Sequence, residues 1–321
     1  MKVLGFGELM IQLNPTSKGP LRHATMFERR VAGSEANVIV GMSRLGNESA
    51  FFTAVGDDEL GNCIISTLNA EKVETKFIKI GSGFTAVYFV ERGYPVPGKT
   101  NVLYYRKGSA CSKITPDDIA PEMFDNIELI FISGITPALS ESCYLASKKM
   151  VEMAREKNIK VVFDTNIRRK LLPDSEIAIT TLRFFLQEAD ILITGIGDLE
   201  HMFPNLSLDD QIGKLREFTS TDLIVFKMGK EGARAYKGKD VFEAKSFDVE
   251  VVDELGAGDA FDAAFLASFM EGKTIGESLI YGNAAGAIVV GVVGDIEPLP
   301  DWKELNTFLS FQKSGEKRLV R

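Results

Sequence analysis

The sequence predicts an α/β fold in which helices cover both faces of a mostly parallel sheet. After residue 107, short apolar runs with strand character alternate with segments of helical length. The runs are 129–132, 160–163, 191–194 and 223–226, and the helical segments are 140–157, 175–188 and 208–220. Parallel strands read as continuous apolar runs because both of their faces are buried. Ligands of such sheets bind at the carboxyl ends of the strands.

Further core elements are predicted on either side of this region. Short buried strands are expected at 3–6 and 50–55, and helices at 33–45, 59–71, 260–270 and 278–290. The first of these helices is expected to end at Gly46-Asn47, because both residue types favour helix termination.

Polar, aromatic-rich strands in the first third of the chain do not suit the central sheet. They span 9–13, 26–31, 84–91 and 102–106, and they alternate apolar with polar residues or carry charges. Strands with one solvent-exposed face belong to a separate layer that is buried on one side only. We therefore divide the chain into an α/β core of residues 1–8, 32–83 and 108–321 and a β lid of residues 9–31 and 84–107.

The composition excludes several classes of function. The 321 residues carry a net charge of −8, which disfavours nucleic acid or an anionic membrane as a partner. Three cysteines without CxxC spacing and two histidines make a zinc site or a disulfide framework improbable. There is no signal-peptide core near Met1 and no apolar run that could span a bilayer. We expect a cytoplasmic protein.

Two apparent nucleotide-binding motifs fail on physical grounds. The stretch 93–100 matches the P-loop pattern GxxxxGK[ST], but Pro95 and Pro97 lack the N–H groups that cradle phosphate. The residues after it favour a strand instead of a helix. Gly5-Phe6-Gly7 lacks the third glycine of a dinucleotide fingerprint because Met10 stands there.

The stretch Gly256-Ala257-Gly258-Asp259 is the strongest candidate site. It lies between an alternating, strand-like segment at 244–252 and the helix predicted from residue 260. The unpaired N–H groups and positive dipole of a helix start favour phosphate. A carboxylate at this point can handle a proton next to that phosphate. The pattern therefore indicates phosphoryl transfer to a small molecule.

Three stretches of the chain resemble the signatures of the ribokinase-type carbohydrate kinases, and the resemblance covers nearly the whole length. They are residues 255–261 (LGAGDAF), residues 32–38 (AGSEANV), where Ala32 replaces a common glycine, and residues 227–233 (KMGKEGA). Within the family, the chain is most similar to 2-keto-3-deoxygluconate kinases. That similarity rests on residues 92–95 (RGYP), 104–110 (YYRKGSA), 164–168 (DTNIR) and 294–295 (GD). The resemblance implies a three-layer sandwich around a mostly parallel sheet, with a small β-sheet lid.

The resemblance assigns catalysis to the turn at 256–259. It implies that Asp259 takes a proton from the sugar hydroxyl that attacks the γ-phosphoryl group, a contribution on the order of 10²–10⁴-fold. The backbone N–H groups of Gly256, Ala257 and Gly258 are expected to hold the charge on the transferred group.

The resemblance also implies two sets of binding residues. Sugar contacts are expected from Gly33, Ser34, Tyr88, Tyr104, Arg106, Arg168, Asp259 and Asp295. Nucleotide contacts are expected from Asn166, Lys227, Gly229, Gly232, Gly256, Ala257, Gly258 and Asn283. The two arginines suit an acidic sugar, because arginine binds a carboxylate bidentately. Plainer roles stay open: lid core for the tyrosines, a surface ion pair for Arg168, a turn aspartate for Asp295, and a core or cap role for Asn283.

The chain departs from the family pattern in two places. Glu254 stands where many members have threonine, and the Asn-x-x-Glu element is replaced by a stretch that contains Asp198 and Glu200. Magnesium is implied by the chemistry, since it bridges nucleotide phosphates and keeps several waters. No protein ligand of the ion is assigned.

The expected activity is ATP- and Mg²⁺-dependent phosphorylation of the terminal hydroxyl of 2-keto-3-deoxygluconate to the 6-phosphate, with its galacto epimer as a second acceptor. The alternatives are a kinase for fructose, ribose or a nucleoside, and a non-catalytic nucleotide or sugar sensor on the same fold. The lid strands would leave an apolar face exposed, so a homo-oligomer that forms through the lid is expected.

Overall fold

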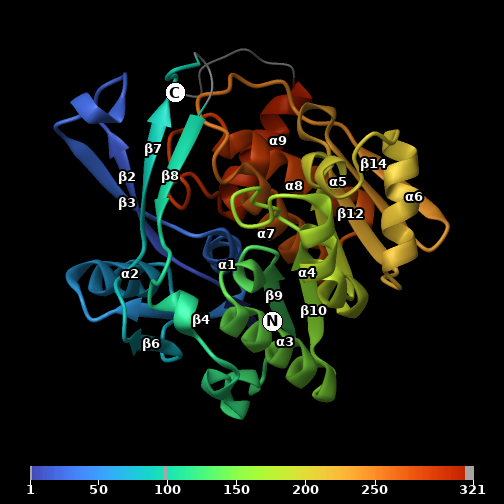
Figure 1. Cartoon of the computed structure of the whole chain (residues 1–321). Coiled ribbons are helices and arrows are strands. Elements are labelled where there is room, and N and C mark those ends of the chain that lie inside the picture. Colours follow the sequence, from blue (N-terminus) through green and yellow to red (C-terminus); the bar gives the residue numbers. More distant parts are fainter. Residues whose placement is uncertain (1, 97–99, 315–321) are drawn as a thin grey trace.

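The computed structural model of the chain describes residues 2–96 and 100–314, and within them the fold is a three-layer α/β sandwich (Figure 1). The central layer is a ten-stranded sheet in the order β14-β13-β12-β11-β10-β9-β1-β4-β5, with β6 paired to β4. Its strands are β1 (Lys2–Phe6), β4 (Glu48–Gly56), β5 (Val73–Glu74), β6 (Ile78–Gly81), β9 (Leu129–Ser133), β10 (Lys160–Asp164), β11 (Ile191–Gly195), β12 (Leu223–Lys227), β13 (Ala233–Lys237) and β14 (Asp240–Ala244). The sheet is parallel from β12 to β5 and β6, and β13 and β14 add an antiparallel edge. The predicted sheet is confirmed.

Helices cover both faces of this sheet. They are α1 (Ser34–Arg44), α2 (Glu59–Ala70), α3 (Glu141–Glu156), α4 (Ser175–Glu188), α5 (Ile196–Met202), α6 (Leu208–Phe218), α7 (Ala257–Met270), α8 (Ile275–Val289) and α9 (Trp302–Ser314). Alternate residues of each central strand face opposite layers, as in β9, where Phe131 joins the core under α1, α7 and α8 and Ile132 joins the core under α3 to α6. This two-sided burial is the reason that the strands are mostly apolar, with polar residues concentrated near their ends.

Helix starts follow the capping residues in the sequence. The side chains of Asp58, Ser140, Asp174, Ser207 and Thr274 accept hydrogen bonds from the first-turn N–H groups of α2, α3, α4, α6 and α8. Such caps satisfy donors that the helix itself leaves unpaired.

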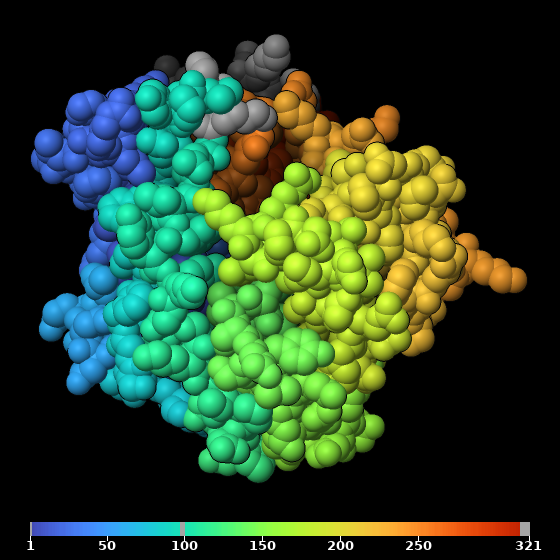
Figure 2. Space-filling model, in the orientation of Figure 1, coloured from blue at the N-terminus to red at the C-terminus, as the bar shows by residue number. Residues whose placement is uncertain are grey.

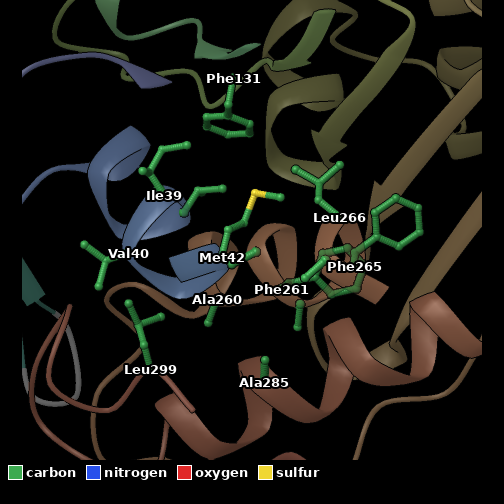
Figure 3. Close-up of a cluster of buried hydrophobic side chains, with 14 of the residues drawn as sticks. Ile39, Val40, Met42, Phe131, Ala260, Phe261, Phe265, Leu266, Ala285 and Leu299 are labelled. Carbon is green, nitrogen blue, oxygen red and sulfur yellow. The ribbon is translucent and has the colours of Figure 1, made fainter. Parts of the chain in front are cut away.

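Helix α1 packs closely on α7, and this contact positions the site. Figure 3 shows Ile39 and Met42 of α1 in one cluster with Phe261 and Phe265 of α7. A Cβ on Gly41 would lie 2.6 Å from the Cβ of Ala263, so glycine permits this separation of the two helices. The N-termini of α1 and α7 are thereby held side by side.

A separate four-stranded sheet stands beside the core (Figure 1, blue and teal). It has the order β3-β2-β7-β8, with β2 (Met10–Pro15), β3 (Phe27–Ala32), β7 (Val87–Arg92) and β8 (Thr100–Tyr105). The P-loop look-alike connects β7 to β8, and a strand follows it, as the sequence predicts. Residues 97–99 of that stretch lie outside the described residues.

One predicted strand is wrong. The alternating segment 244–252 is not a strand beyond Ala244, where β14 ends, and the described residues 245–256 contain no regular element. The apolar residues of this segment do not form one buried face of a strand. The centroid of the Phe247 ring lies 5.1 Å from that of Phe308 in α9, while Val251 and Val252 are exposed. Helix α7 also starts at Ala257, three residues before the predicted start.

Several elements were not predicted from the sequence. They are strands β5, β6, β13 and β14 and helices α5 and α9. The shortest of them, β5 with two residues and β6 with four, are too short for a periodic pattern. In the part of the chain that the structure describes, no helix has both the length and the apolar character needed to cross a membrane.

Candidate active site

A larger and a smaller cavity lie on either side of the N-terminus of α7, at the carboxyl ends of the central strands. The larger has a volume of about 550 Å³ and the smaller about 80 Å³. Figure 2 shows the surface hollowed between the teal strands of the small sheet and the yellow segments, with orange and dark red segments deeper inside. The turn at 256–259 contributes residues to both cavities.

The backbone conformation of the turn depends on Gly256. This residue has a φ of +76°, in the left-handed region, and a Cβ there would lie 3.2 Å from Oδ1 of Asp295. The helix begins directly after it, so the N–H groups of Ala257 and Gly258 have no partner within the helix. These groups and the helix dipole suit an anion at the larger cavity.

Asp259 is buried at the start of α7 and is held by two residues of α1. Its Oδ1 accepts a 2.7 Å hydrogen bond from Oγ of Ser34, and its Oδ2 accepts a 2.8 Å bond from Nδ2 of Asn37. Burial raises the pKa of Asp259 above its ordinary value, although the Ser34 and Asn37 donors and the charges of Lys227 and Arg168 oppose the rise. The result is an oriented carboxylate next to both cavities.

Asn37 is a functional candidate that sequence reasoning missed. It lies three residues after Ser34, so both side chains project from the same face of α1 toward Asp259. That i, i+3 spacing inside the AGSEANV stretch was the available signal.

The smaller cavity gathers all of the residues expected to bind sugar. It is lined by Gly33, Ser34, Tyr88, Tyr104, Arg106, Arg168, Asp259 and Asp295, among others. Tyr88 and Tyr104 are paired across β7 and β8 with ring centroids 5.6 Å apart. Tyr88 also packs in the apolar cluster of the small sheet. It is therefore both a core residue of the lid and a wall residue of the cavity, the two roles that the sequence left open.

The two arginines of this cavity differ in their partners. Nε of Arg106 donates a 2.6 Å hydrogen bond to the buried Glu8, which also accepts a bond from Ser109. Among the described residues, the guanidinium of Arg168 makes no hydrogen bond or ion pair. Arg168 is therefore the cation that is free to meet an acidic ligand. Glu8 was not singled out from the sequence, where it reads only as a residue after a buried strand.

Asp295 ties the smaller cavity to the small sheet. Its Oδ2 accepts a 2.7 Å hydrogen bond from Nε2 of Gln12 and a 3.0 Å bond from the hydroxyl of Tyr88. Burial and then the charge of Asp259 raise the pKa of Asp295 to about 7, while the Tyr88 bond opposes the rise.

The larger cavity holds most of the residues expected to bind nucleotide. Lys227, Gly229, Gly232, Ala257, Gly258 and Asn283 line it. Nζ of Lys227 lies 2.9 Å from Oδ2 of Asp164 and 3.0 Å from Oδ2 of Asp262. Although burial opposes the charge on Lys227, these two carboxylates raise its pKa above its ordinary value.

Asn283 has a structural contact in addition to its place in the cavity wall. Its Nδ2 donates to the carbonyl oxygens of Ala244 and Lys245, at 2.9 and 3.1 Å. The amide thus holds the chain after β14 against α8, which matches the plainer role that the sequence left open.

Asn166 and Gly256 are placed differently from the other expected nucleotide contacts. Nδ2 of Asn166 donates to Oγ of Ser34, and Asn166 is not among the residues that line the larger or the smaller cavity. Gly256 lines the smaller cavity. Asn166 thus contacts one of the expected sugar-binding residues, and Gly256 shares the smaller cavity with the others.

The carboxylates near the cavities suit a loosely held magnesium better than a closed metal cage. Within residues 2–96 and 100–314, there is no group of three or more His, Cys, Asp or Glu side chains placed to hold a metal. Asp198 accepts from Oγ1 of Thr165 at 2.6 Å and from the Ile167 N–H at 3.2 Å, and burial raises its pKa. Oδ1 of Asp164 is buried without a partner in the described structure, so an oxygen donor is available. Such a set fits an ion that keeps waters and phosphate ligands.

The raised pKa of Asp295 predicts a pH-dependent stability. A carboxyl that binds its proton more tightly when folded contributes stability below its unfolded pKa near 3.8, and that contribution is lost as the pH rises through about 7. The free energy of unfolding should fall between pH 5 and pH 8 by about 2–3 kcal/mol more in the wild type than in Asp295→Asn. Denaturant unfolding at both pH values measures this, with the exposed Asp117→Asn as a control. Equal pH slopes for wild type and Asp295→Asn would contradict it.

Comparisons with known proteins identify the family of the chain. Residues 1–302 match the pfkB family carbohydrate kinases. The chain is 36% identical over 311 residues to the 2-dehydro-3-deoxygluconokinase of Thermoproteus tenax, covering 96% of this chain and 94% of that protein. It is 29% identical over 316 residues to fructokinase-2 of Solanum lycopersicum, covering 96% and 95%.

A solved structure with a similar fold contains ATP and Mg²⁺. A candidate ribokinase II of E. coli in complex with ATP and Mg²⁺ superposes with a TM-score of 0.88 at 27% identity, over 96% of this chain and 99% of that chain. The match along residues 1–302, the α/β sandwich and the helix-start carboxylate lead to one conclusion. The chain belongs to the pfkB family of carbohydrate kinases.

Proposed function

We propose that the protein uses ATP and Mg²⁺ to phosphorylate the terminal hydroxyl of 2-keto-3-deoxygluconate, also named 2-dehydro-3-deoxygluconate, to its 6-phosphate. Its galacto epimer is a second acceptor. The observation that carries the proposal is the position of Asp259, which is buried, held by Ser34 and Asn37, and placed between the smaller and the larger cavity. The T. tenax relative bears the name of this activity.

Among the described residues, the smaller cavity contains one unpaired cation, and this cation favours an acid over a neutral sugar. Asp259 and Asp295 are acidic, so a carboxylate ligand needs cations in the same cavity. Arg168 supplies an unpaired guanidinium, while Glu8 already offsets most of the charge of Arg106. In our proposal, Arg168 binds the carboxylate and Arg106 adds a second, weaker contact.

Asp259 acts as the general base in this proposal. Its carboxylate accepts the proton of the attacking hydroxyl, and the Ser34 and Asn37 donors hold it in one orientation. The N–H groups of Ala257 and Gly258, with the helix dipole, hold negative charge on the transferred phosphoryl group. Magnesium, when bound with the nucleotide, neutralises charge on its phosphates.

The larger cavity is the proposed ATP site. Its volume of about 550 Å³ suits a nucleotide, and Gly229 has open space where a Cβ would stand. Lys227 brings a fixed positive charge to the end of this cavity next to Gly258. A ligand that enters here places its phosphates toward the start of α7.

An acceptor panel tests the function. With ATP and Mg²⁺, 2-keto-3-deoxygluconate and its galacto epimer should be phosphorylated with a higher kcat/KM than fructose, ribose or nucleosides. Asp259→Asn should lower kcat by about 10²–10⁴-fold, because the base is lost, and should leave ATP affinity largely intact. Coupled kinase assays and ATP titration measure both effects.

Matched variants and negative outcomes make this test decisive. Asp117→Asn, at an exposed aspartate, should keep wild-type kinetics. A preference for fructose or a nucleoside would replace the proposed acceptor. An absence of turnover with every acceptor would favour a sensor, and full activity of Asp259→Asn would exclude the proposed base.

The carboxylate contact predicts an acid-specific loss of affinity. Arg168→Ala should raise the KM for the keto-deoxy acid by about 10- to 100-fold, the value of a charge-assisted hydrogen bond, with far less effect on a neutral acceptor.

Arg106→Ala should also affect the acid more than a neutral sugar, and should lower Tm because the buried Glu8 loses its partner. Equal losses for both acceptors would show that neither arginine recognises the carboxylate.

We also propose that the protein is a homo-oligomer that assembles through the small sheet. The outer face of this sheet carries a cross-strand row of Leu13, Phe89 and Leu103, and the Phe27 and Tyr105 rings lie 5.5 and 5.8 Å from that of Phe89. Leu103 is 43% exposed and Tyr105 is 54% exposed. A second copy of the same face would cover this apolar surface.

Light scattering at micromolar concentration tests the assembly. The wild type should have the mass of an oligomer, and Leu103→Glu should shift it to the monomer because a charge enters the covered face. Leu145→Glu, at a similarly exposed leucine of α3, is the control. A monomeric wild type, or an unchanged mass for Leu103→Glu, would contradict assembly through this face.

A further inference from the structure

A series of buried and half-buried hydrogen bonds links the small sheet to the loop before α7, and it begins at Arg92. From this arrangement, we infer that Arg92 is a positioning residue that couples the small sheet to the catalytic turn. The inference rests on the proposed roles of the smaller cavity and Asp259. Arg92 is not among the residues that line the larger or the smaller cavity, so it acts through its partners.

Arg92 lies at the end of β7 and bridges two parts of the molecule. Its Nη2 donates a 2.5 Å hydrogen bond to Oδ2 of Asp253, and its Nη1 donates a 2.7 Å bond to Oδ1 of Asn14 in β2. The Asp253 side chain is 2% exposed and Asn14 is 4% exposed. The ion pair is therefore shielded from water on the Asp253 side, where loss of the cation leaves a buried charge without its partner.

Asp253 connects Arg92 to the catalytic turn. Its Oδ1 accepts a 3.3 Å hydrogen bond from the Leu255 N–H, directly before Gly256. Its own N–H donates to the carbonyl oxygen of Val290 beyond α8, at 3.1 Å. Because residues 245–256 lack regular structure, these few bonds set the path of the chain into the turn.

The second branch runs from Arg92 to the smaller cavity. Oδ1 of Asn14 accepts from Arg92, so its Nδ2 is left to donate, and it donates to Oε1 of Gln12 at 3.0 Å. The Nε2 of Gln12 then donates to Oδ2 of Asp295, a wall residue of the smaller cavity. Each amide has one acceptor side and one donor side, so the cation at Arg92 sets the direction of every bond in this branch.

Arg92 also places positive charge near a group of acids. The charges of Asp259 and Asp253 both act on Asp295, so the acids repel one another. Without the guanidinium, Asp253 adds an unpaired negative charge to this group. The position of the small sheet over the sugar and the position of Asp259 would then both change.

Kinetics of Arg92 variants test the inference. Arg92→Gln should lower kcat/KM for the preferred acceptor by about 10²-fold, the loss that a 1 Å misplacement of reacting groups causes, while the Kd for ATP changes less than about threefold. Arg92→Lys, which keeps a charge that can reach Asp253, should recover at least about a tenth of the lost activity. Arg92→Gln combined with Asp253→Asn should be no worse than Arg92→Gln alone, because both variants remove the same pair.

A second measurement separates positioning from general destabilisation. In Arg92→Gln, amide hydrogen exchange should increase together in β7 and in residues 253–258, and it should stay unchanged in β9 and β10. Arg155→Gln, which breaks an ion pair with Asp190 at the amino ends of β10 and β11, is the control and should change neither kinetics nor exchange at these segments.

Three results would overturn the inference. They are wild-type acceptor kinetics in Arg92→Gln, equal losses for acceptor and ATP without rescue by lysine, and exchange that increases in β7 but not in residues 253–258. The comparison uses whichever acceptor the wild type phosphorylates, so preference for a neutral sugar would refute the proposed acceptor and leave the role of Arg92 open to the same measurements. If no acceptor is turned over, the exchange experiment decides.

Discussion

The structure depends on one buried contact, the pair of hydrogen bonds from Ser34 and Asn37 of α1 to the carboxylate of Asp259 in α7. The partners are 225 and 222 residues apart in the chain. They meet because α1 and α7 pack closely through Gly41 and Ala263 on one face of the central sheet. Without the bonds, burial would leave Asp259 with unsatisfied oxygens and a charge that favours protonation. The helix pair thus keeps the proposed base usable.

Other buried charges near the cavities are also paired with groups of opposite charge. Lys227 lies between Asp164 and Asp262, Arg106 pairs with Glu8, and Arg92 pairs with Asp253. Each pair includes a carboxylate that is almost fully removed from water, where an unpaired charge is costly. Arg168 is the exception among the described cations of the smaller cavity, since its guanidinium has no such partner. An unpaired cation beside buried acids is suited to an anionic ligand.

The two faces of the small sheet differ in polarity. The inner face supplies Gln12, Asn14 and Tyr88, whose polar groups join the core in a directed series of hydrogen bonds. The outer face is apolar and exposed at Leu103 and Tyr105. The inner polar bonds specify one position for the sheet, because misplacement would leave buried amides unsatisfied. The outer face is the surface through which we propose that two copies of the protein meet.

The sequence by itself determined the alternation of strands and helices and the position of the glycine-rich turn, because local periodicity and capping residues carry both. Its resemblance to a kinase family also pointed to eight of the residues that line the smaller cavity, although Glu8 and Asn37 were missed. The strand predicted at 244–252 was wrong because Phe247 owes its burial to α9, which local alternation does not report. Tertiary structure alone decided that Glu8 offsets Arg106, that Asn37 holds Asp259, that Asn166 lies by Ser34, and that Arg92 meets Asp253. These contacts join residues from 98 to 222 positions apart, and only packing of the whole chain brings such groups together.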